Sequence, residues 1–289
     1  MKETQDPWLF EISSKRKLVE LNFKEIWRYR DLMLLFVKRD LVTVYKQTIL
    51  GPLWFFIQPL FTSVIFTLVF NNIASIKTDP IPAFLFNLSG ITAWNYFKVC
   101  LSSTSNTFRS NAGIFGKVYF PRFIVPLSNV VSNLFKLGIQ LVILVGFYVY
   151  YVFYDHATIA PDKHLLLFPV YVFLMAIYGL GLGMIISTMT TKYRDLSLLL
   201  TFAIQLLMYV SAVPYPMSQL KAKVPQYAWL VDYNPLAQIM EGFRYSLFTT
   251  SNLHFSWNGL AWVATLGIAL FFVGLLLFNR TEKTFIDTV

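Results

Sequence analysis

The sequence predicts an all-α integral membrane protein with six transmembrane helices, an N-terminal amphipathic interface helix, and re-entrant outer half-helices between spans five and six. The chain of 289 residues is 56% hydrophobic and only 13% charged. This is more apolar surface than a soluble domain of this length can bury. Six apolar stretches each approach the roughly 20 residues that cross a hydrocarbon core. They are Leu53–Ile73, Ala83–Leu101, Pro126–Tyr154, Leu165–Met189, Leu196–Val213 and Trp257–Phe278. We therefore expect a cytosolic arm, residues 1–51, and a six-helix transmembrane domain, residues 52–289.

Charge inside the six stretches is almost absent. None of them contains Asp or Glu, and their only full charges are Lys98 and Lys136. Ion-coupled pumps and membrane enzymes usually need carboxylates or histidines within the membrane. The sequence therefore disfavours both classes and predicts that energy comes from outside this chain.

The orientation follows from the distribution of Lys and Arg. With both termini in the cytosol, seventeen of these residues lie on the cytosolic side and five on the other, as the positive-inside rule requires. This rule and anionic lipid headgroups explain the net charge of +9. No nucleic-acid partner is expected, because the basic residues follow the membrane ends and do not form a basic domain.

Residues 23–45 precede the first span and predict a helix that lies in the membrane interface. Apolar residues recur there at helical spacing, with charged residues on the other faces: Ile26, Tyr29, Met33, Phe36, Val37, Leu41 and Val44. A plain lipid anchor is the alternative. The chain then turns sharply into the first span, because Gly51 permits a tight turn and Pro52 suits the first position of a helix. Basic and aromatic groups at this elbow could receive an anionic lipid headgroup.

The loop between the second and third spans, residues 102–125, predicts a docking surface for a partner. Arg109, Lys117 and Arg122 give it three positive charges, and its Arg109–Arg122 part has no negative one. Apolar and aromatic residues are interspersed with them, which suggests a contact surface on the cytosolic side. Simple positive-inside flanking explains the charges but not the aromatic content. The candidate contact residues are Asn111, Ile114, Phe115, Lys117, Tyr119, Phe120 and Arg122.

Polar residues within the third span fall on one helical face. Ser128, Ser132, Lys136 and Gln140 recur every four residues, so they should point toward protein or water. They could line a hydrophilic path, or form interhelical hydrogen bonds while Lys136 snorkels to the cytosolic side. The fourth span has a strip of three glycines, residues 179, 181 and 183, which predicts close helix packing.

The segment 214–256 predicts half-helices that dip back into the outer leaflet. It contains four prolines and many aromatic residues, and Asn234-Pro235 is a good helix start. The helix that follows is too short, and with Glu241 and Arg244 too charged, to span a membrane. A solvent-exposed loop is the alternative, and its aromatic content argues against it.

Several chemical motifs are missing from the sequence. There is no G-x-x-x-x-G-K-[ST] phosphate loop and no H-E-x-x-H, and the single cysteine, Cys100, excludes a disulfide framework. We expect no cofactor and no metal in this chain, and ATP use only through another polypeptide. The chain has 28 Phe, 16 Tyr and 7 Trp, which could line a path for a glycan or simply face lipid.

Motifs along nearly the whole chain resemble the membrane subunit of type-2 ABC exporters for polysaccharides, the permeases for O-antigen, capsule and teichoic acid. The motifs are Phe36-Val37-Lys38-Arg39-Asp40, Tyr45 through Trp54, Lys117 through Arg122 with Pro126-Leu127-Ser128, Lys192-Tyr193-Arg194-Asp195, Tyr215-Pro216-Met217-Ser218, and Asn234-Pro235-Leu236 through Glu241-Gly242-Phe243-Arg244.

The resemblance implies a permease that moves an undecaprenyl-diphosphate-linked, O-antigen-like polysaccharide across the bacterial cytoplasmic (inner) membrane. Two copies would form a continuous channel above two separate ATPase subunits, which bind the ATP and Mg. The 109–122 loop would be the coupling helix. A drug or small-lipid exporter of the same architecture is the alternative. An embedded glycosyl- or acyltransferase is not expected, because its carboxylates would have to come from Asp155, Asp162, Asp232 and Glu241 on the outer side.

The resemblance also implies a cytosolic entrance and an outer gate. Residues near the cytosolic entrance for a lipid diphosphate headgroup are Arg39, Tyr45, Lys46, Leu50 and Gly51. The resemblance does not fix the channel lining, for which our candidates are Trp54, Phe55, Gln58, Trp94, Tyr96, Lys136, Gln140 and Tyr209. Candidates for the outer gate are Tyr215, Pro216, Trp229, Asn234, Pro235 and Arg244.

Overall fold

The computed structural model describes residues 23–46, 51–78, 80–155, 159, 162–193, 195–223, 225–248, 253 and 255–285. Every regular element within these ranges is a helix, which confirms the all-α fold class. The first half contains α1 (Phe23–Arg28), α2 (Arg30–Lys46), η1 (Gly51–Leu53), α3 (Trp54–Phe66), the π-helix η2 (Thr67–Ile73), α4 (Ala83–Ser105), α5 (Thr107–Phe115) and α6 (Ile124–Phe153). The second half contains η3 (Lys163–Leu167), α7 (Phe168–Lys192), α8 (Leu196–Val210), α9 (Met217–Lys223), η4 (Pro225–Tyr227), α10 (Ala228–Asp232), α11 (Pro235–Phe248) and α12 (Trp257–Phe285).

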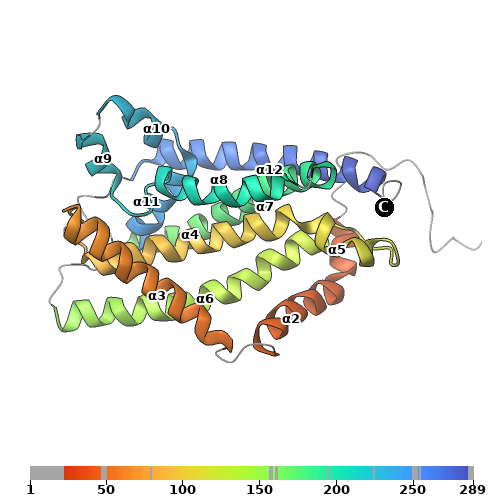
Figure 1. Ribbon diagram of the computed structural model, residues 1–289, viewed down its shortest axis with the longest axis horizontal. Coiled ribbons are helices and arrows are strands. Elements are labelled where there is room, and N and C mark those ends of the chain that lie inside the picture. Colours follow the sequence, from red (N-terminus) through yellow and green to blue (C-terminus); the bar gives the residue numbers. More distant parts are fainter. Residues whose placement is uncertain are drawn as a thin grey trace, which may run out of the picture.

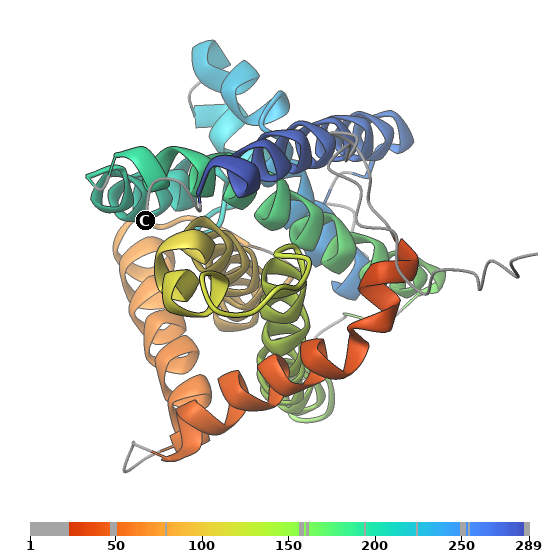
Figure 2. The same ribbon diagram turned by 90° about the vertical axis from the view of Figure 1, so that its right-hand side faces the viewer.

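The long helices form one elongated bundle. Helices α4, α6, α7 and α12 run along its long axis, with α9, α10 and α11 at one end and α5 at the other (Figure 1). We call these the α11 end and the α5 end. Helix α4 packs against α3, α6, α7, α8 and α11, while α2 crosses the bundle beside α6 (Figure 2).

Four helical segments are long and apolar enough to cross a membrane. They are Trp54–Ile73, Ile124–Phe153, Lys163–Lys192 and Trp257–Glu282. Two of the six predicted spans fall short of this standard: α4 because of its polar residues, and α8 because it has only 15 residues. The structure therefore supports a multi-pass membrane protein with four clear spans, and six spans stay a prediction.

Helix α4 is polar where the other long helices are apolar, and the structure shows why it can be. Its Asn87, Ser89, Thr92 and Thr104 are all fully buried against neighbouring helices. On α3, by contrast, the apolar Phe61 is 67% exposed. Lipid is as apolar as a protein core, so apolar side chains can face outward and polar ones collect inside.

Glycines let α7 approach its two neighbours closely. A Cβ on Gly179 or Gly183 would lie 2.7 and 2.5 Å from the Cβ atoms of Cys100 and Thr104 on α4. On the other side, a Cβ on Gly181 would lie 2.9 Å from the Leu270 backbone of α12. The predicted packing role of this strip is confirmed.

The helix predicted before the first span is present but interrupted, and its place in the membrane interface stays a prediction. The chain turns at Tyr29 between α1 and α2, and Phe36 and Val37 on α2 are buried. Trp27, Leu34 and Leu35 are more than half exposed, so an apolar face is also left open. At the elbow before α3, Gly51 has φ +48°, the left-handed conformation that the predicted tight turn requires.

Candidate functional site

The predicted docking loop at the α5 end is divided into a buried half and an exposed half. Phe115 and Phe120 are 5% and 4% exposed, with ring centroids 5.7 Å apart. Phe36 of α2 lies 5.8 Å from Phe120, and Phe108 of α5 stacks on Phe278 of α12 at 4.5 Å. The buried aromatic residues thus join α2, α5 and α12 into one unit.

Arg122 fastens the end of this loop to the last helix. Its Nη1 donates a hydrogen bond of 2.6 Å to the Glu282 carbonyl of α12, and its guanidinium lies 5.3 Å from the centre of the Phe115 ring. Burial lowers the pKa of Arg122, and the nearby Glu282 carboxylate opposes this shift. Asn111 is also buried, and its Nδ2 donates a hydrogen bond of 2.9 Å to the Thr107 carbonyl in the same helix. These two predicted contact residues therefore hold the loop in shape.

The other predicted contact residues face outward. Tyr119 is 64% exposed and Ile114 36%, and Lys117 is also exposed. The neighbouring Val118, 57% exposed, extends this surface. We call Ile114, Lys117, Val118 and Tyr119 the coupling surface. An exposed apolar group supported by a rigid aromatic base is suited to contact with another protein.

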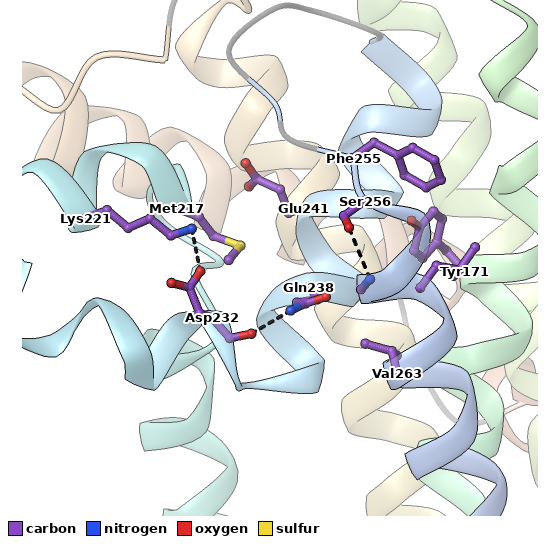
Figure 3. A pocket seen from close by; sticks show the side chains of 12 residues that line it. Tyr171, Met217, Lys221, Asp232, Gln238, Glu241, Phe255, Ser256 and Val263 are labelled. Atoms are coloured by element: carbon purple, nitrogen blue, oxygen red, sulfur yellow. Dashed lines mark hydrogen bonds and ion pairs between the residues drawn. The ribbon is translucent and has the colours of Figure 1, made fainter.

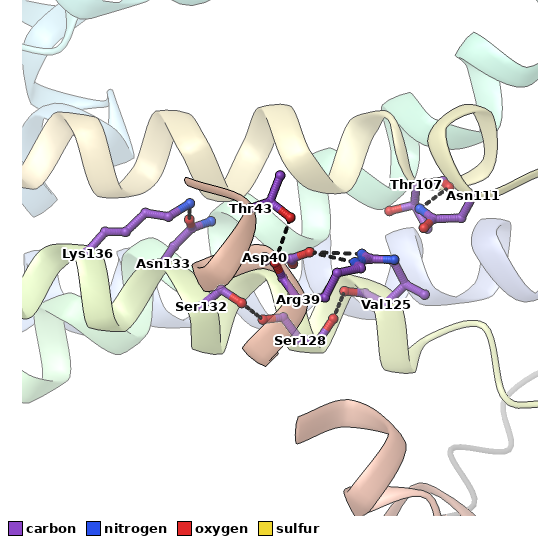
Figure 4. Close-up of polar contacts among 10 residues, drawn as sticks. All are labelled: Arg39, Asp40, Thr43, Thr107, Asn111, Val125, Ser128, Ser132, Asn133 and Lys136. Atoms are coloured by element: carbon purple, nitrogen blue, oxygen red, sulfur yellow. Dashed lines mark hydrogen bonds and ion pairs between the residues drawn. The ribbon is translucent and has the colours of Figure 1, made fainter. Parts of the chain in front are cut away.

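The polar face of α6 is satisfied mostly within α6 itself (Figure 4). Ser128 donates to the Val125 carbonyl at 2.8 Å, and Ser132 to the Ser128 carbonyl at 2.9 Å. Lys136 donates to Asn133 Oδ1 at 2.9 Å and lies 5.9 Å from the Phe55 ring centre of α3. The predicted face exists, but its serines do not bridge to other helices.

The residues predicted to receive a lipid headgroup are only partly described. The Tyr45 side chain and Leu50 lie outside the described residues. Arg39 pairs with Asp40 at 2.9 Å and lies 4.8 Å from the Phe36 ring centre, while Lys46 is exposed. A pairing with Asp40 reduces the net positive charge that Arg39 offers an anion.

The predicted channel-lining residues do not share one surface of this chain. Trp94, Tyr96 and Gln140 are buried among α4, α6 and their neighbours, whereas Trp54, Gln58 and Tyr209 are exposed. Phe55 and Lys136 are half-buried and lie together. The exposed members on α3 and α8 are the ones that another molecule can reach.

The α11 end is built around a capped helix. Asn234 Oδ1 accepts a hydrogen bond from the Leu236 backbone N–H at 2.9 Å, and its Nδ2 donates to the Val210 carbonyl at 3.1 Å. Helix α11 begins at Pro235, as predicted. Tyr215 donates to the Tyr209 carbonyl, which holds the segment after α8. Pro216 is buried, and Trp229 is 57% exposed.

Arg244 of α11 is fully buried and joins three elements. Its Nη1 donates to the Ala212 carbonyl at 2.9 Å, its Nη2 donates to the Val213 carbonyl, and its guanidinium lies 3.7 Å from the Phe86 ring centre of α4. Ala212 has φ +54°, a left-handed conformation that is uncommon for alanine. Arg244 therefore stabilises the turn after α8.

A polar network between η2 and α4 was not predicted. Asn87 Nδ2 donates to Thr67 Oγ1 at 3.0 Å and to Asn71 Oδ1 at 2.8 Å, and Thr67 and Asn71 belong to the π-helix η2. The signal in the sequence was a pair of polar residues four apart, Thr67 and Asn71, within an apolar stretch. Such pairs point to a neighbouring helix.

Comparison with known proteins identifies the family of this chain. Residues 31–248 match the family described as ABC-2 type transporter. Two proteins from Klebsiella pneumoniae, each called O-antigen export system permease protein RfbA, are 27% identical to this chain over 259 and 258 residues, which is 89% of the chain and 94% of each relative. A protein of the same name from Myxococcus xanthus is 26% identical over 223 residues, 76% of the chain and 82% of the relative. The matched region runs from α2 to α11 and includes both ends of the bundle, and this chain therefore belongs to the ABC-2 type transporter family.

Proposed function

We propose that this chain is the transmembrane subunit of an ATP-driven exporter that moves a lipid-linked, O-antigen-like polysaccharide across the bacterial cytoplasmic membrane. The observation that carries the proposal is its similarity, over 94% of their length, to two permeases called O-antigen export system proteins. The alternative, a drug or small-lipid exporter of the same architecture, has no such relative among these proteins.

ATP hydrolysis would take place in a separate subunit that docks at the α5 end. The coupling surface supports this assignment, because exposed Ile114, Val118 and Tyr119 stand on a buried aromatic base. The base connects the surface to α2 and α12 through Phe120 and Arg122. A movement of the partner would therefore pass directly to helices of the membrane domain.

The working unit would contain two copies of this chain and two ATPase subunits. Helices α3 and α8 carry exposed apolar residues such as Phe61 and Leu198, which suit either lipid or a second copy. In a dimer joined there, the exposed candidates Trp54, Gln58 and Tyr209 would face a shared path. The lipid tail would stay in the bilayer while the sugars pass along these aromatic residues.

The topology that fits this proposal has six spans with both termini in the cytosol. The two remaining spans would be α4 and α8. At 1.5 Å per residue, the 23 residues of α4 reach ~34 Å, enough for a hydrocarbon core of about 30 Å. Segment 214–248, which follows α8, would then lie at the outer leaflet.

Deleting the gene for this chain tests the proposal. We expect lipid-linked polysaccharide to accumulate on the cytosolic leaflet and to disappear from the cell surface. In a separate purification, a tagged copy should retain its ATPase subunit. The matched control is the same strain complemented with the wild-type chain, which should restore surface polysaccharide.

The outcomes separate the two exporter hypotheses. Trapped glycan together with a stable complex supports polysaccharide export. If the complex is stable, no glycan is trapped and drugs stimulate the ATPase, the result favours a drug or small-lipid exporter. Failure to retain any ATPase subunit would overturn the role given to the coupling surface.

A further inference from the structure

A cavity of about 260 Å³ lies at the α11 end, and none of the predicted channel or gate residues lines it. Residues of five helices, α7, α9, α10, α11 and α12, contribute to its walls. Figure 3 shows α9 and α10 on one side of the cavity and α12 on the other. Ligand pockets are usually about 300–1,000 Å³, so this cavity suits a single ring and not an extended molecule.

One side of the cavity is aromatic and apolar. Tyr171 of α7 and Phe255 before α12 supply rings, and Leu260 and Val263 of α12 add aliphatic surface. The Tyr171 ring occupies its place because residue 242 is glycine: a Cβ there would lie 2.1 Å from the ring. Flat apolar faces of this kind pack against the C–H face of a pyranose ring.

The other side offers hydrogen-bonding groups. Glu241 of α11 lines the cavity but is only 2% exposed, and both of its carboxylate oxygens are buried. Gln238 is held by its Nε2, which donates to the Asp232 carbonyl at 2.5 Å. Ser256 Oγ accepts from the Gly259 backbone N–H at 3.3 Å and is exposed at the edge. The amide of Gln238 and the hydroxyl of Ser256 can bond the hydroxyls of a sugar.

The charge balance argues against an anionic ligand. Among the described lining residues Lys221 is the one cation, and it forms an ion pair with Asp232. Glu241 adds a negative charge, with Arg244 behind it as an electrostatic partner. A phosphate in the cavity would lie near these negative charges while the lining cation, Lys221, is already paired, whereas a neutral polyol would not be repelled.

We propose that this cavity binds one sugar ring of the polysaccharide as it emerges on the non-cytosolic side. This inference rests on the proposed function, because that function supplies the glycan and the orientation of the chain. It adds a sugar-binding site within each copy, apart from any path between two copies. Such a site would retain newly exported sugars outside the membrane.

Site-specific photo-crosslinking tests the inference in the assembled exporter. The crosslinking amino acid p-benzoylphenylalanine replaces Ser256, which is exposed at the edge of the cavity. The matched control carries the same amino acid at Trp262 of α12, which is 48% exposed and does not line the cavity. Irradiated cells that make the polysaccharide are then probed for glycan attached to this chain.

We expect glycan at position 256 and none at 262. Equal attachment at both positions, attachment of phospholipid alone, or no attachment at 256 while export continues would each overturn the inference. The deletion strain separates the two proposals. If it traps no glycan, the proposed function fails; if it traps glycan but the cavity does not crosslink, only the cavity inference fails.

A substitution that fills the cavity gives an independent readout. Leu260→Trp adds volume inside it, and the control Ala261→Trp places a tryptophan on the exposed side of α12. We expect only Leu260→Trp to reduce surface polysaccharide and to abolish the crosslink at Ser256. Wild-type export and crosslinking in a folded Leu260→Trp protein would contradict the proposal.

Discussion

At each end of the bundle, a buried arginine makes similar contacts, but the surroundings that it stabilises differ. Arg122 at the α5 end and Arg244 at the α11 end each donate to backbone carbonyls and lie against a phenylalanine ring. Arg244 is enclosed by α4, α11 and the turn after α8, so it completes the protein interior at the α11 end. Arg122 fixes a base from which Tyr119 and its neighbours project. One arginine completes a protein interior, and the other supports a surface for a partner.

Removing Arg244 should have the largest effect. Arg244→Met leaves the buried carbonyls of Ala212 and Val213 without their donor, at a cost of about 3–5 kcal/mol in the free energy of unfolding. Thermal unfolding of the detergent-purified protein measures this loss. Arg280→Met, at an exposed position on α12, is the control and should unfold like wild type. Equal unfolding temperatures for both variants would show that Arg244 does not hold the α11 end.

Phe115 tests the buried base of the α5 end. Phe115→Ala removes a ring that contacts Phe108, Phe120 and Arg122, and should cost about 3 kcal/mol. The unfolding temperature should fall, and the ATPase subunit should be lost as a consequence. Phe115→Leu preserves most of the volume and should lose much less stability. A fully stable Phe115→Ala protein would mean that the aromatic base is dispensable.

Gly90 tests how tightly Arg244 is enclosed. A Cβ at residue 90 would lie 2.0 Å from Arg244 Nη2 and 3.0 Å from the Val213 carbonyl oxygen, so Gly90→Ala must displace the guanidinium. We expect a loss of about 1–3 kcal/mol in the unfolding assay. Gly138→Ala on α6 is the matched control, because no atom lies within 4 Å of its Cβ. It should be neutral or slightly stabilising. Identical behaviour of the two variants would contradict the described packing.

Tyr119 should have the smallest effect on stability and a specific effect on assembly. Tyr119→Ala changes a residue that is 64% exposed, so the free energy of unfolding should change by less than about 0.5 kcal/mol. Co-purification of the ATPase subunit should nevertheless decrease, because the coupling surface loses its largest member. Tyr154→Ala, at a residue 78% exposed at the opposite end of α6, should retain the subunit. Full retention by Tyr119→Ala would remove this residue from the proposed interface.

Local sequence patterns predicted much of both ends. Asn234-Pro235 predicted the start of α11, and Gly51 predicted the left-handed turn before α3, because caps and turns depend on a few consecutive residues. The docking loop was recognised from its aromatic content, but its residues were not separated into base and surface. That separation depends on Phe36 and Glu282, which lie far from the loop in sequence.

The sequence by itself determined that this is a helical membrane protein, because composition and apolar stretches fix where a chain can meet lipid. Its motifs and the match over residues 31–248 gave the ABC-2 type transporter family. The tertiary structure alone decided which polar residues are inside. Helix α4 is the clearest case: its polar residues exclude it from the clear spans, yet Asn87 and Thr104 are fully buried. The cavity beside Tyr171 and Glu241 has the same origin. Five helices form it, and no pattern within one helix reports contacts between residues so distant in the chain.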